Sequence, residues 1–206
     1  MTSVIGLLGG TFDPIHNGHL AVARYLRTAL DPARVHMIPS AVPPHRKAPV
    51  SAAPHRLAML ELALVGETGL VPDTRELHRT GPSYSLWTLR SLRAEFPDSP
   101  LCWIVGADAW PGVTSWYRWY ELFSLAHFVV VKRPGFRLSP SRAAGLSPDM
   151  GELRRHSAGC CVSCDGPAVD VSASAIRRRI ASGEDVSDSV PQAVWSYIRQ
   201  QHLYGS

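Results

Sequence analysis

Short apolar runs alternate with amphipathic stretches along most of the chain. The apolar runs predict β-strands over Val4–Leu8, Val35–Pro39, Leu70–Pro72, Leu101–Val105 and His127–Lys132, with a further short strand near Val162 or Val169. The stretches with helical spacing predict α-helices over Gly18–Leu30, Pro54–Val65, Ser83–Phe96, Tyr117–Leu125, Ser174–Ser182 and Pro191–Gln201. Leu101–Val105 and Phe128–Val131 are apolar at every position, which is typical of strands covered on both faces.

This alternation predicts the fold class. Strands that alternate with helices indicate an α/β fold with a Rossmann-like, doubly wound parallel sheet. A length of 206 residues suits one domain with a sizeable core, so we expect residues 1–206 to form a single domain. Its last part, from about residue 172 to 206, is expected to be a small helical subdomain. The loops 40–51 and 134–148, rich in proline and glycine, are expected at the surface.

The composition of the chain indicates which classes of binding partner can be expected. The chain has 21 basic and 17 acidic residues and a net charge of +4. That excess suits anionic small molecules but is too small and dispersed to predict nucleic-acid binding. The apolar runs are too short to span a membrane, and Met1-Thr2-Ser3 lacks the basic region of a secretory signal. We therefore expect a cytoplasmic protein with no membrane partner.

The cysteines allow two readings. Cys102 lies in an apolar strand pattern and is expected to be a buried thiol. Cys161 and Cys164 have the spacing of a metal-ligand pair, with Cys160 close by. A zinc site needs a second ligand pair at matching distance, and the sequence offers no clear one. Free thiols in a reducing compartment are therefore the favoured interpretation.

The richest candidate chemistry follows the first predicted strand, in the segment Gly9–His19, called here the first loop. Its glycines allow a sharp turn and a close approach to an anion, and its proline restricts the backbone. His16 and His19 share a face if the helix has begun, and both imidazoles can donate to phosphate oxygens. A helix start at the end of a buried strand predicts a phosphate site. The alternative is a glycine turn with two ordinary surface histidines.

Two clusters point to a second substrate. His45, Arg46 and Lys47 follow the second strand, at the same edge of the sheet as the first loop. Alone they suggest a solvated basic loop, but beside a phosphate site they favour binding of a substrate phosphate. Ser83 is expected to cap the next helix, and the hydroxyl of Ser85 can meet a ligand carboxylate.

Two further clusters could complete a nucleotide site. Asp108 follows a buried strand, where a carboxylate can accept hydrogen bonds from ribose hydroxyls or adjust a metal-bound water. Trp116 belongs to an aromatic cluster that is mostly expected in the core, although one ring facing a cleft could stack on a heteroaromatic ring. Ser174 and Arg177 begin a late helix, where hydroxyls, free N–H groups and a fixed cation favour an anion.

The first loop carries a family resemblance. Gly10-Thr11-Phe12-Asp13-Pro14 followed by His16-x-Gly18-His19 resembles the nucleotidylyltransferase superfamily, whose members join a phosphate acceptor to a nucleoside triphosphate and release pyrophosphate. Class I aminoacyl-tRNA synthetases have a related His-x-Gly-His element. This chain lacks their Lys-Met-Ser-Lys-Ser loop and has no room for an anticodon-binding domain.

The later motifs sharpen the resemblance. In order and spacing the chain resembles the bacterial nicotinate mononucleotide adenylyltransferases, from about residue 4 to 204. The motifs that carry this are Pro43-Pro44-His45, Ser83-Tyr84-Ser85, Trp103 to Asp108 with Trp116, Val131 to Gly135, Ser172 to Arg177, and the tail with Tyr197-Ile198 and His202-Leu203-Tyr204. The family usually has threonine at position 85 and often at 174, and lysine at 46, so which cation contacts phosphate stays open.

The resemblance implies a reaction and a set of site residues. It implies that ATP and nicotinate mononucleotide give nicotinate adenine dinucleotide and pyrophosphate, by direct in-line attack and without a covalent enzyme intermediate. Mg²⁺ would be carried by the ATP phosphates, with no metal ligand from the protein. The implied site residues are His16 and His19 for catalysis; Gly9, Gly10, Thr11, Phe12, Gly106, Asp108, Ser174, Ile176 and Arg177 for ATP; and His45, Arg46, Lys47, Tyr84, Ser85, Trp116 and Arg133 for the mononucleotide.

Two other functions stay open at this point. The acceptor could instead be nicotinamide mononucleotide or phosphopantetheine, which a requirement for the substrate carboxylate would distinguish. The chain could also be a nucleotide-binding regulator without turnover, although His16, His19 and Arg177 argue against this. The sequence leaves the oligomeric state open, with a homo-oligomer among the expected partners.

Overall fold

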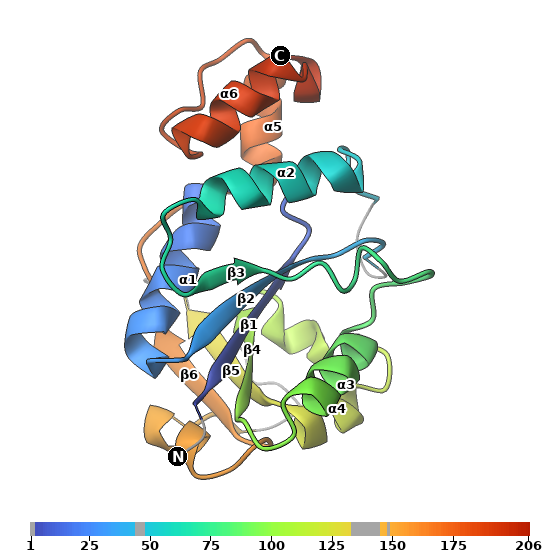
Figure 1. Cartoon of the computed structure of the whole chain (residues 1–206). Coiled ribbons are helices and arrows are strands. Elements are labelled where there is room, and N and C mark those ends of the chain that lie inside the picture. Colours follow the sequence, from blue (N-terminus) through green and yellow to red (C-terminus); the bar gives the residue numbers. More distant parts are fainter. Residues whose placement is uncertain (1–2, 44–47, 133–144, 148) are drawn as a thin grey trace.

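A six-stranded sheet forms the centre of the computed structural model, which describes residues 3–43, 48–132, 145–147 and 149–206 (Figure 1). All neighbouring strands are parallel, and their order is β3-β2-β1-β4-β5-β6. The strands are β1 (Ile5–Gly10), β2 (Arg34–Pro39), β3 (Leu70–Pro72), β4 (Leu101–Gly106), β5 (His127–Lys132) and β6 (Cys161–Asp165). The predicted Rossmann-like sheet is confirmed, and its last strand lies at Val162 rather than Val169.

Each predicted helix is present within about two residues of its expected bounds. The helices are α1 (Asn17–Leu30), α2 (Ala53–Leu64), α3 (Ser85–Glu95), α4 (Trp119–Leu125), α5 (Ala173–Ala181) and α6 (Gln192–Gln200). Three short 3-10 helices were not predicted: η1 (Trp110–Ser115), η2 (Met150–Arg154) and η3 (Leu203–Gly205). No described helix has the length and apolar character needed to cross a bilayer.

Two apolar layers cover the two faces of the sheet. Because side chains alternate along a strand, Leu8 and Val129 face one layer while Leu7 and Phe128 face the other. The first layer contains residues of α1, α2, α5 and α6. The second contains residues of α3, η1 and α4, including the fully buried Trp110. Burial on both faces explains the continuous apolar runs in the central strands.

The strand order identifies the point of the sheet at which a ligand-binding crevice is expected. β1 pairs with β2 on one side and β4 on the other, and the chain leaves β1 in one direction across the sheet and returns to it at β4. This is the topological switch point of a doubly wound sheet, where ligands bind outside the carboxyl ends of the strands. The first loop follows β1 and Asp108 follows β4, so both lie at that point.

The last helices return the chain to the first half of the molecule. α6 packs against α2, and both lie at the end of the molecule that carries α5 (Figure 1). The hydroxyl of Tyr197 on α6 lies 3.0 Å from Nδ1 of His55 on α2. Beyond α6, the turn η3 contacts α5 and approaches the first loop.

The cysteines are free thiols, as predicted. Cys161 and Cys164 lie on β6 three positions apart, so their side chains point to opposite faces of the sheet and pack in different apolar layers. This separation excludes a metal site shared by the pair. Burial raises the pKa values of Cys102 and Cys161 to about 12, which keeps both thiols protonated and unreactive at neutral pH.

Candidate active site

The first loop turns at Phe12 rather than at its glycines. Gly9 and Gly10 are the last residues of β1, so the predicted glycine turn is wrong. The chain turns where Phe12 has a φ of 49°, just before a cis bond joins Asp13 to Pro14. Gly10 is needed for a different reason, because a Cβ there would lie 2.8 Å from the Phe12 ring. The buried Phe12 ring therefore packs against the strand end and fixes the direction of the loop.

The two histidines stack at the start of α1. His16 is the N-cap residue, and its ring lies 3.6 Å from that of His19 with an interplanar angle of 22°. A Cβ on Gly18 would lie 3.1 Å from the His16 ring, so this glycine permits the stack. The main-chain N–H of His16 donates to Nδ1 of His19 at 3.3 Å. Because Nδ1 accepts, a neutral His19 ring carries its proton on Nε2, which makes Nε2 a hydrogen-bond donor.

The start of α5 lies beside the first loop, although the two are far apart in the sequence. Arg177 Nη1 donates to the main-chain oxygen of Asp13 at 2.6 Å. Ser174 and Arg177 line a cavity of about 620 Å³ together with residues from the loop after β2 and the C-terminal turn. The remaining lining residues are Val50, Arg178, Ala181, Tyr204 and Gly205. The structure thus brings together the two segments that the sequence assigned to a triphosphate.

The residues at the start of α5 differ in their burial and in their contacts. Ser172 caps α5, since its hydroxyl accepts from the N–H of Ala175 at 3.3 Å. Ser174 is exposed, and its hydroxyl lies 3.3 Å from that of Ser172. The side chain of Ile176 is 1% exposed and packs in the core. The assignment of Ile176 to ATP therefore stays a prediction, and its side chain faces the core instead of the cavity.

The end of β4 presents the predicted carboxylate to solvent. Gly106 is the last residue of β4, and Asp108 is exposed two residues later. A Cβ on Gly106 would lie 2.6 Å from Oδ1 of Asp108, so the carboxylate folds back over the strand end. Asp108 therefore stands at the switch point with its oxygens accessible, as a ribose-binding carboxylate requires.

The start of α3 differs from the prediction at Ser83. Ser83 does not cap the helix; its hydroxyl accepts from the N–H groups of Ala41 at 2.9 Å and Val42 at 3.2 Å. α3 begins at Ser85, with Tyr84 as the N-cap residue. Ser83 thus ties the start of α3 to the loop after β2, and this fixes the position of Ser85.

Aromatic rings connect α3 to the segment after β4. Tyr84 stacks on Tyr117, with ring centroids 4.6 Å apart and an interplanar angle of 27°. Trp116, next to Tyr117, is half-buried and packs against the second apolar layer. The predicted stacking residue and the predicted carboxylate-binding residue therefore belong to two segments in direct contact. Trp110, Trp119 and Trp195 pack in or against the core.

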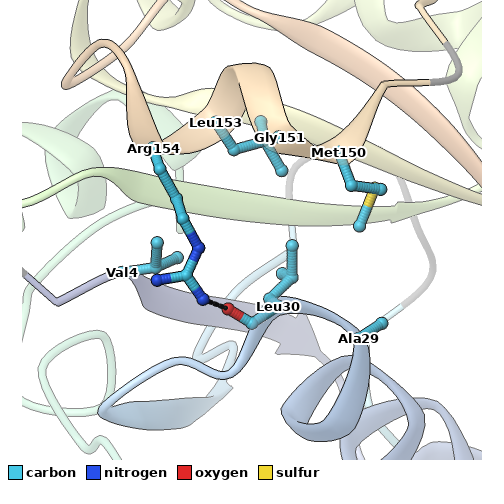
Figure 2. Close-up of a pocket in the computed structure, with 7 residues that line it drawn as sticks. All are labelled: Val4, Ala29, Leu30, Met150, Gly151, Leu153 and Arg154. Atoms are coloured by element: carbon cyan, nitrogen blue, oxygen red, sulfur yellow. Dashed lines mark hydrogen bonds between the residues drawn. The ribbon is translucent and has the colours of Figure 1, made fainter.

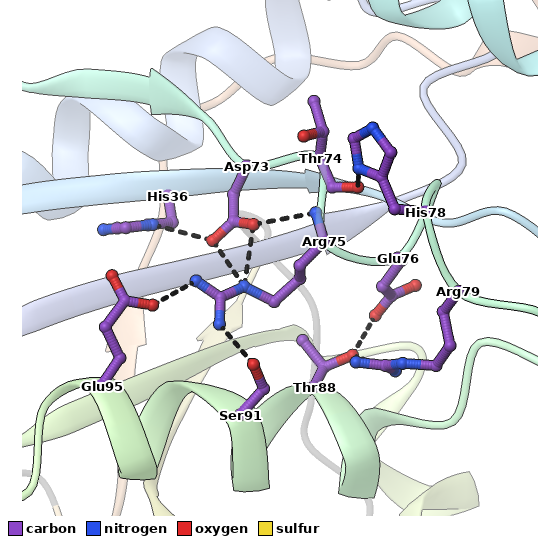
Figure 3. A network of polar contacts seen from close by, with 10 residues as sticks. All are labelled: His36, Asp73, Thr74, Arg75, Glu76, His78, Arg79, Thr88, Ser91 and Glu95. Carbon is purple, nitrogen blue, oxygen red and sulfur yellow. Dashed lines mark hydrogen bonds and ion pairs between the residues drawn. The ribbon is translucent and has the colours of Figure 1, made fainter.

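A polar network holds the connection between β3 and α3, residues 73–84, called here the β3–α3 connection (Figure 3). Asp73 accepts from Arg75 Nε at 2.8 Å and lies 2.9 Å from Nδ1 of His36. Burial alone would raise the pKa of Asp73, but the hydrogen bonds to His36 and Arg75 outweigh it and hold the pKa well below its usual range. Arg75 also donates to Glu95 on α3. The network therefore fixes the edge of the sheet to that helix.

A second buried carboxyl lies in the same connection. The hydroxyl of Thr88 on α3 donates to Glu76 Oε1 at 2.6 Å, and Arg79 donates to the same hydroxyl at 3.2 Å (Figure 3). Burial raises the pKa of Glu76, and hydrogen bonds from Thr88 and Ser83 offset this only in part. Glu76 thus holds Ser83, which in turn holds the main chain after β2.

Arg56 supports the first loop, although no sequence motif predicts this role. Its side chain is 1% exposed, and its Nη1 donates to the main-chain oxygens of Thr11 and Ser40, each at 2.7 Å. Its Nε donates to the main-chain oxygen of Ser51 at 3.2 Å. Burial lowers the pKa of Arg56, and the charge of Asp13 opposes this. An arginine on an otherwise apolar helix face was the only available signal.

Some predicted site residues cannot be compared with the structure. His45, Arg46, Lys47 and Arg133 lie outside the described residues. A separate cavity of about 140 Å³ lies between the amino end of β1 and η2, and contains none of the predicted site residues (Figure 2). There Arg154 donates to the main-chain oxygen of Leu30 at 2.7 Å. Within the described part of the chain, no group of three or more His, Cys, Asp or Glu side chains could hold a metal ion.

Comparison with protein families identifies relatives over most of the chain. Residues 7–179 match the family model described as cytidylyltransferase-like. A protein of Aeromonas hydrophila named "Probable nicotinate-nucleotide adenylyltransferase" is 44% identical, over 97% of this chain and 96% of its own length. A protein of Marinobacter nauticus with the same name is also 44% identical, with the same coverage of both chains.

Solved structures share the fold at low sequence identity. The nicotinic acid mononucleotide adenylyltransferase of Plasmodium falciparum, complexed with NaAD, has a TM-score of 0.73 at 15% identity and covers 98% of this chain and 97% of its own. A solved structure from Vibrio parahaemolyticus, named "Putative Nicotinate-nucleotide Adenylyltransferase", has a TM-score of 0.68 at 16% identity and covers 100% of this chain and 97% of its own. At these identities the structures support the fold alone.

Proposed function

The chain belongs to the cytidylyltransferase-like family and, within it, to the nicotinate-nucleotide adenylyltransferases, and we propose that it transfers AMP from ATP to nicotinate mononucleotide. The products would be nicotinate adenine dinucleotide and pyrophosphate, a step of NAD biosynthesis. Relatives at 44% identity over nearly the whole chain support this assignment. The whole chain would act as one unit in the cytoplasm, with small molecules as its substrates.

One observation carries the proposal most directly. Arg177 Nη1 lies 2.6 Å from the main-chain oxygen of Asp13, within the first loop. This contact places a fixed cation and a helix start beside the stacked histidines, at the switch point of the sheet. A triphosphate needs such a convergence of N–H donors and positive charge from several segments.

The chemistry is a single displacement at phosphorus. An oxygen of the acceptor's 5′-phosphate attacks the α-phosphorus of ATP, and the bond from that phosphorus to the oxygen bridging to the β-phosphorus breaks in line. The electron pair of the broken bond leaves with pyrophosphate. No enzyme nucleophile or general base is needed, because the attacking phosphate is already anionic. Catalysis then depends on positioning and on stabilisation of negative charge.

The residues of the first loop and α5 would bind the triphosphate. We assign Nε2–H of His19, with His16 beside it, to the α-phosphate oxygens that gain charge during transfer. Ser174 and Arg177 would bind the β- and γ-phosphates until they leave as pyrophosphate. The segment from Gly9 to Phe12 would contact ATP along the end of β1, and Gly106 with Asp108 would hold adenosine and its ribose. Because the side chain of Ile176 is buried, any contact of Ile176 with ATP would have to come from its main chain.

The residues around the start of α3 would bind the acceptor. Trp116 would stack on the pyridine ring, and Ser85 with nearby main-chain donors would receive the carboxylate, with Tyr84 alongside. His45, Arg46, Lys47 and Arg133 remain our prediction for the acceptor phosphate. Glu76, whose pKa is raised by burial, supports this end of the site through its hydrogen bond with Ser83.

Magnesium would enter with ATP. Asp13, the carboxylate within the first loop, already accepts from Val50 N, Ser51 N and Tyr204 Oη, which leaves it poorly suited to bind a cation. The other side chains assigned to the phosphates are imidazole, hydroxyl and guanidinium groups, which act here as donors to phosphate oxygens. An ion held by phosphate oxygens and water fits this set of residues and would neutralise phosphate charge.

The proposal is tested by pyrophosphate release from ATP and Mg²⁺ with three acceptors at matched concentrations: nicotinate mononucleotide, nicotinamide mononucleotide and phosphopantetheine. We expect fast release with the acid and much slower release with the other two. Equal rates with acid and amide would refute the carboxylate pocket. Release with phosphopantetheine alone would reassign the acceptor, and no release despite ATP binding would favour a regulator.

A further inference from the structure

The C-terminal turn returns to the first loop through one tyrosine. The hydroxyl of Tyr204 in η3 donates to Oδ1 of Asp13 at 2.7 Å, across 191 positions of the sequence. Tyr204 also lines the cavity that contains Ser174 and Arg177. The last residues of the chain therefore contact the same loop that carries the two histidines.

Asp13 connects four segments of the chain. Its side chain belongs to a residue that is 4% exposed, and its two oxygens accept from Val50 N at 2.6 Å, Ser51 N at 3.2 Å and Tyr204 Oη. Its main-chain oxygen accepts from Arg177 at 2.6 Å. A buried carboxylate is stable only when such donors surround it, so the arrangement depends on every one of them.

The phenol of Tyr204 is suited to donate. Burial raises the pKa of Tyr204, and its hydrogen bond to Asp13 raises it further, while a hydrogen bond from Ser51 opposes this. The phenol therefore keeps its proton at neutral pH. Since its oxygen lies against an acceptor-only carboxylate, the proton points at Asp13.

We propose that Tyr204 and Asp13 are positioning residues for the transfer reaction. The phenol orients the Asp13 carboxylate, which fixes the main chain at Val50 and Ser51, while the Asp13 carbonyl fixes the guanidinium of Arg177. Neither residue touches substrate in this account, which rests on the proposed function of Arg177 and the first loop. The C-terminal turn thus completes the phosphate-binding site.

The C-terminal part of the chain is also held through α6, independently of Tyr204. The effect of Tyr204 on the geometry at Asp13 can therefore be tested separately from the attachment of the C-terminal part. Tyr197 on α6 contacts His55 on α2 at 3.0 Å, and Val194 and Ile198 of the same helix are buried in the core. These contacts hold α6 without help from Tyr204. Loss of the Tyr204 hydroxyl alone should therefore leave the chain folded and change the geometry at Asp13.

The matched variants are Tyr204→Phe and Tyr197→Phe, each of which removes one phenolic hydroxyl from the C-terminal part. kcat and KM are measured from pyrophosphate release and expressed per ATP-binding site, so that any unfolded fraction cancels. We expect Tyr204→Phe to lower kcat about tenfold, below the ~10²-fold cost of a 1 Å misplacement. Tyr197→Phe should keep the wild-type kcat and KM, and both variants should remain folded at the assay temperature.

A double-mutant cycle tests whether Tyr204 acts through Asp13. Asp13→Asn removes the charge and leaves one oxygen for donors that now use two, so it should lower kcat more than Tyr204→Phe. In the Asp13→Asn background, the further change Tyr204→Phe should cost about twofold or less, because the residues act as a unit. Independent effects that multiply would overturn the proposal.

The outcomes separate this inference from the proposed function. Equal kcat per site in Tyr204→Phe and wild type would refute the positioning role, as would an equal loss in Tyr197→Phe. If the wild-type protein releases no pyrophosphate with any acceptor, the proposed function fails. The effect of Tyr204 on the phosphate-binding site is then tested by the ATP Kd of the variants instead of kcat. We then expect an ATP Kd about fivefold higher in Tyr204→Phe only, and unchanged binding would overturn it.

Discussion

The loop after β2 is held at its two ends by different means. At its far end, the side-chain oxygens of Asp13 accept directly from the main chain at Val50 and Ser51. At its near end, the carboxyl of Glu76 acts through Ser83, whose hydroxyl accepts from the main chain at Ala41 and Val42. One carboxyl lies in the first loop, and the other lies in the β3–α3 connection.

The difference between the two ends matches the ligands that we propose for each. Around the first loop, buried charges fix main-chain atoms, and Arg56 and Arg177 add positive charge where a triphosphate would be placed. In the β3–α3 connection, burial raises the pKa of Glu76, which acts on the main chain through Ser83. At the first loop, carboxyl and guanidinium groups therefore bind the main chain directly, whereas in the β3–α3 connection a carboxyl with a raised pKa acts through Ser83.

The largest expected effect concerns the first loop. His19→Ala removes the Nε2–H donor, and we expect kcat to fall about 10²–10³-fold, the usual cost of losing one donor to a transition-state oxyanion. Far-UV circular dichroism and thermal unfolding should match wild type. His78→Ala provides the control, since His78 is exposed and its Nδ1 lies 3.0 Å from the main-chain oxygen of Thr74, away from the first loop. A His19→Ala variant with full turnover would contradict the assigned role.

The buried arginine is expected to matter for stability as well. Arg56→Met removes the donor to the main-chain oxygens of Thr11, Ser40 and Ser51, and leaves them buried with fewer partners. We expect the free energy of unfolding to fall by about 3 kcal/mol, measured by urea denaturation. kcat of the folded fraction should fall too, because the first loop loses its support. A loss below about 0.5 kcal/mol, the range of ordinary surface substitutions, would contradict this role.

A substitution that weakens the β3–α3 connection should affect binding of the acceptor but not of ATP. Thr88→Val keeps the shape of a fully buried side chain but removes the donor to Glu76. We expect a loss of about 1–2 kcal/mol in unfolding free energy and a rise of about threefold in KM for the acceptor, with KM for ATP unchanged. Equal changes in the KM values for the acceptor and for ATP would show that the two ends of the loop after β2 do not act on separate substrates.

The smallest expected effect is a pH dependence of stability at Glu76. Since burial raises the folded-state pKa above the unfolded value of about 4.3, Glu76 stabilises the fold below that pH. This contribution is lost as the pH rises through the folded-state pKa. Glu76→Gln does not titrate, so its stability relative to wild type should increase between pH 4 and pH 8, measured by urea denaturation. A difference independent of pH would contradict the raised pKa.

The sequence predicted the sheet and the site's general location for clear reasons. Short apolar runs such as Leu101–Val105 are typical of strands buried on both faces, and the alternation with helices leaves few topologies. Because the carboxyl ends of parallel strands meet at one edge, the first loop and Asp108 could be placed together without coordinates. The hydroxyl-rich start of α5 and Arg177 could likewise be recognised from local pattern.

Other features depend on contacts that a local pattern does not contain. The turn at Phe12 instead of Gly9 and Gly10 arises because the strand continues to pair with β2 through Gly10. Ser83 has the sequence of a helix cap, but the N–H groups of the loop after β2 lie closer to its hydroxyl. The partners of Asp13 lie up to 191 positions away, so only the folded chain reveals them.

The most direct test of the account is the stereochemistry at the α-phosphorus. ATP carrying a chiral α-thiophosphate is converted with nicotinate mononucleotide, and the configuration of phosphorus in the dinucleotide product is determined. A single in-line displacement, with the first loop and α5 acting only as positioned donors, predicts inversion. Retention would indicate a covalent adenylyl-enzyme intermediate and contradict the mechanism, and absence of the dinucleotide would contradict the proposed function itself.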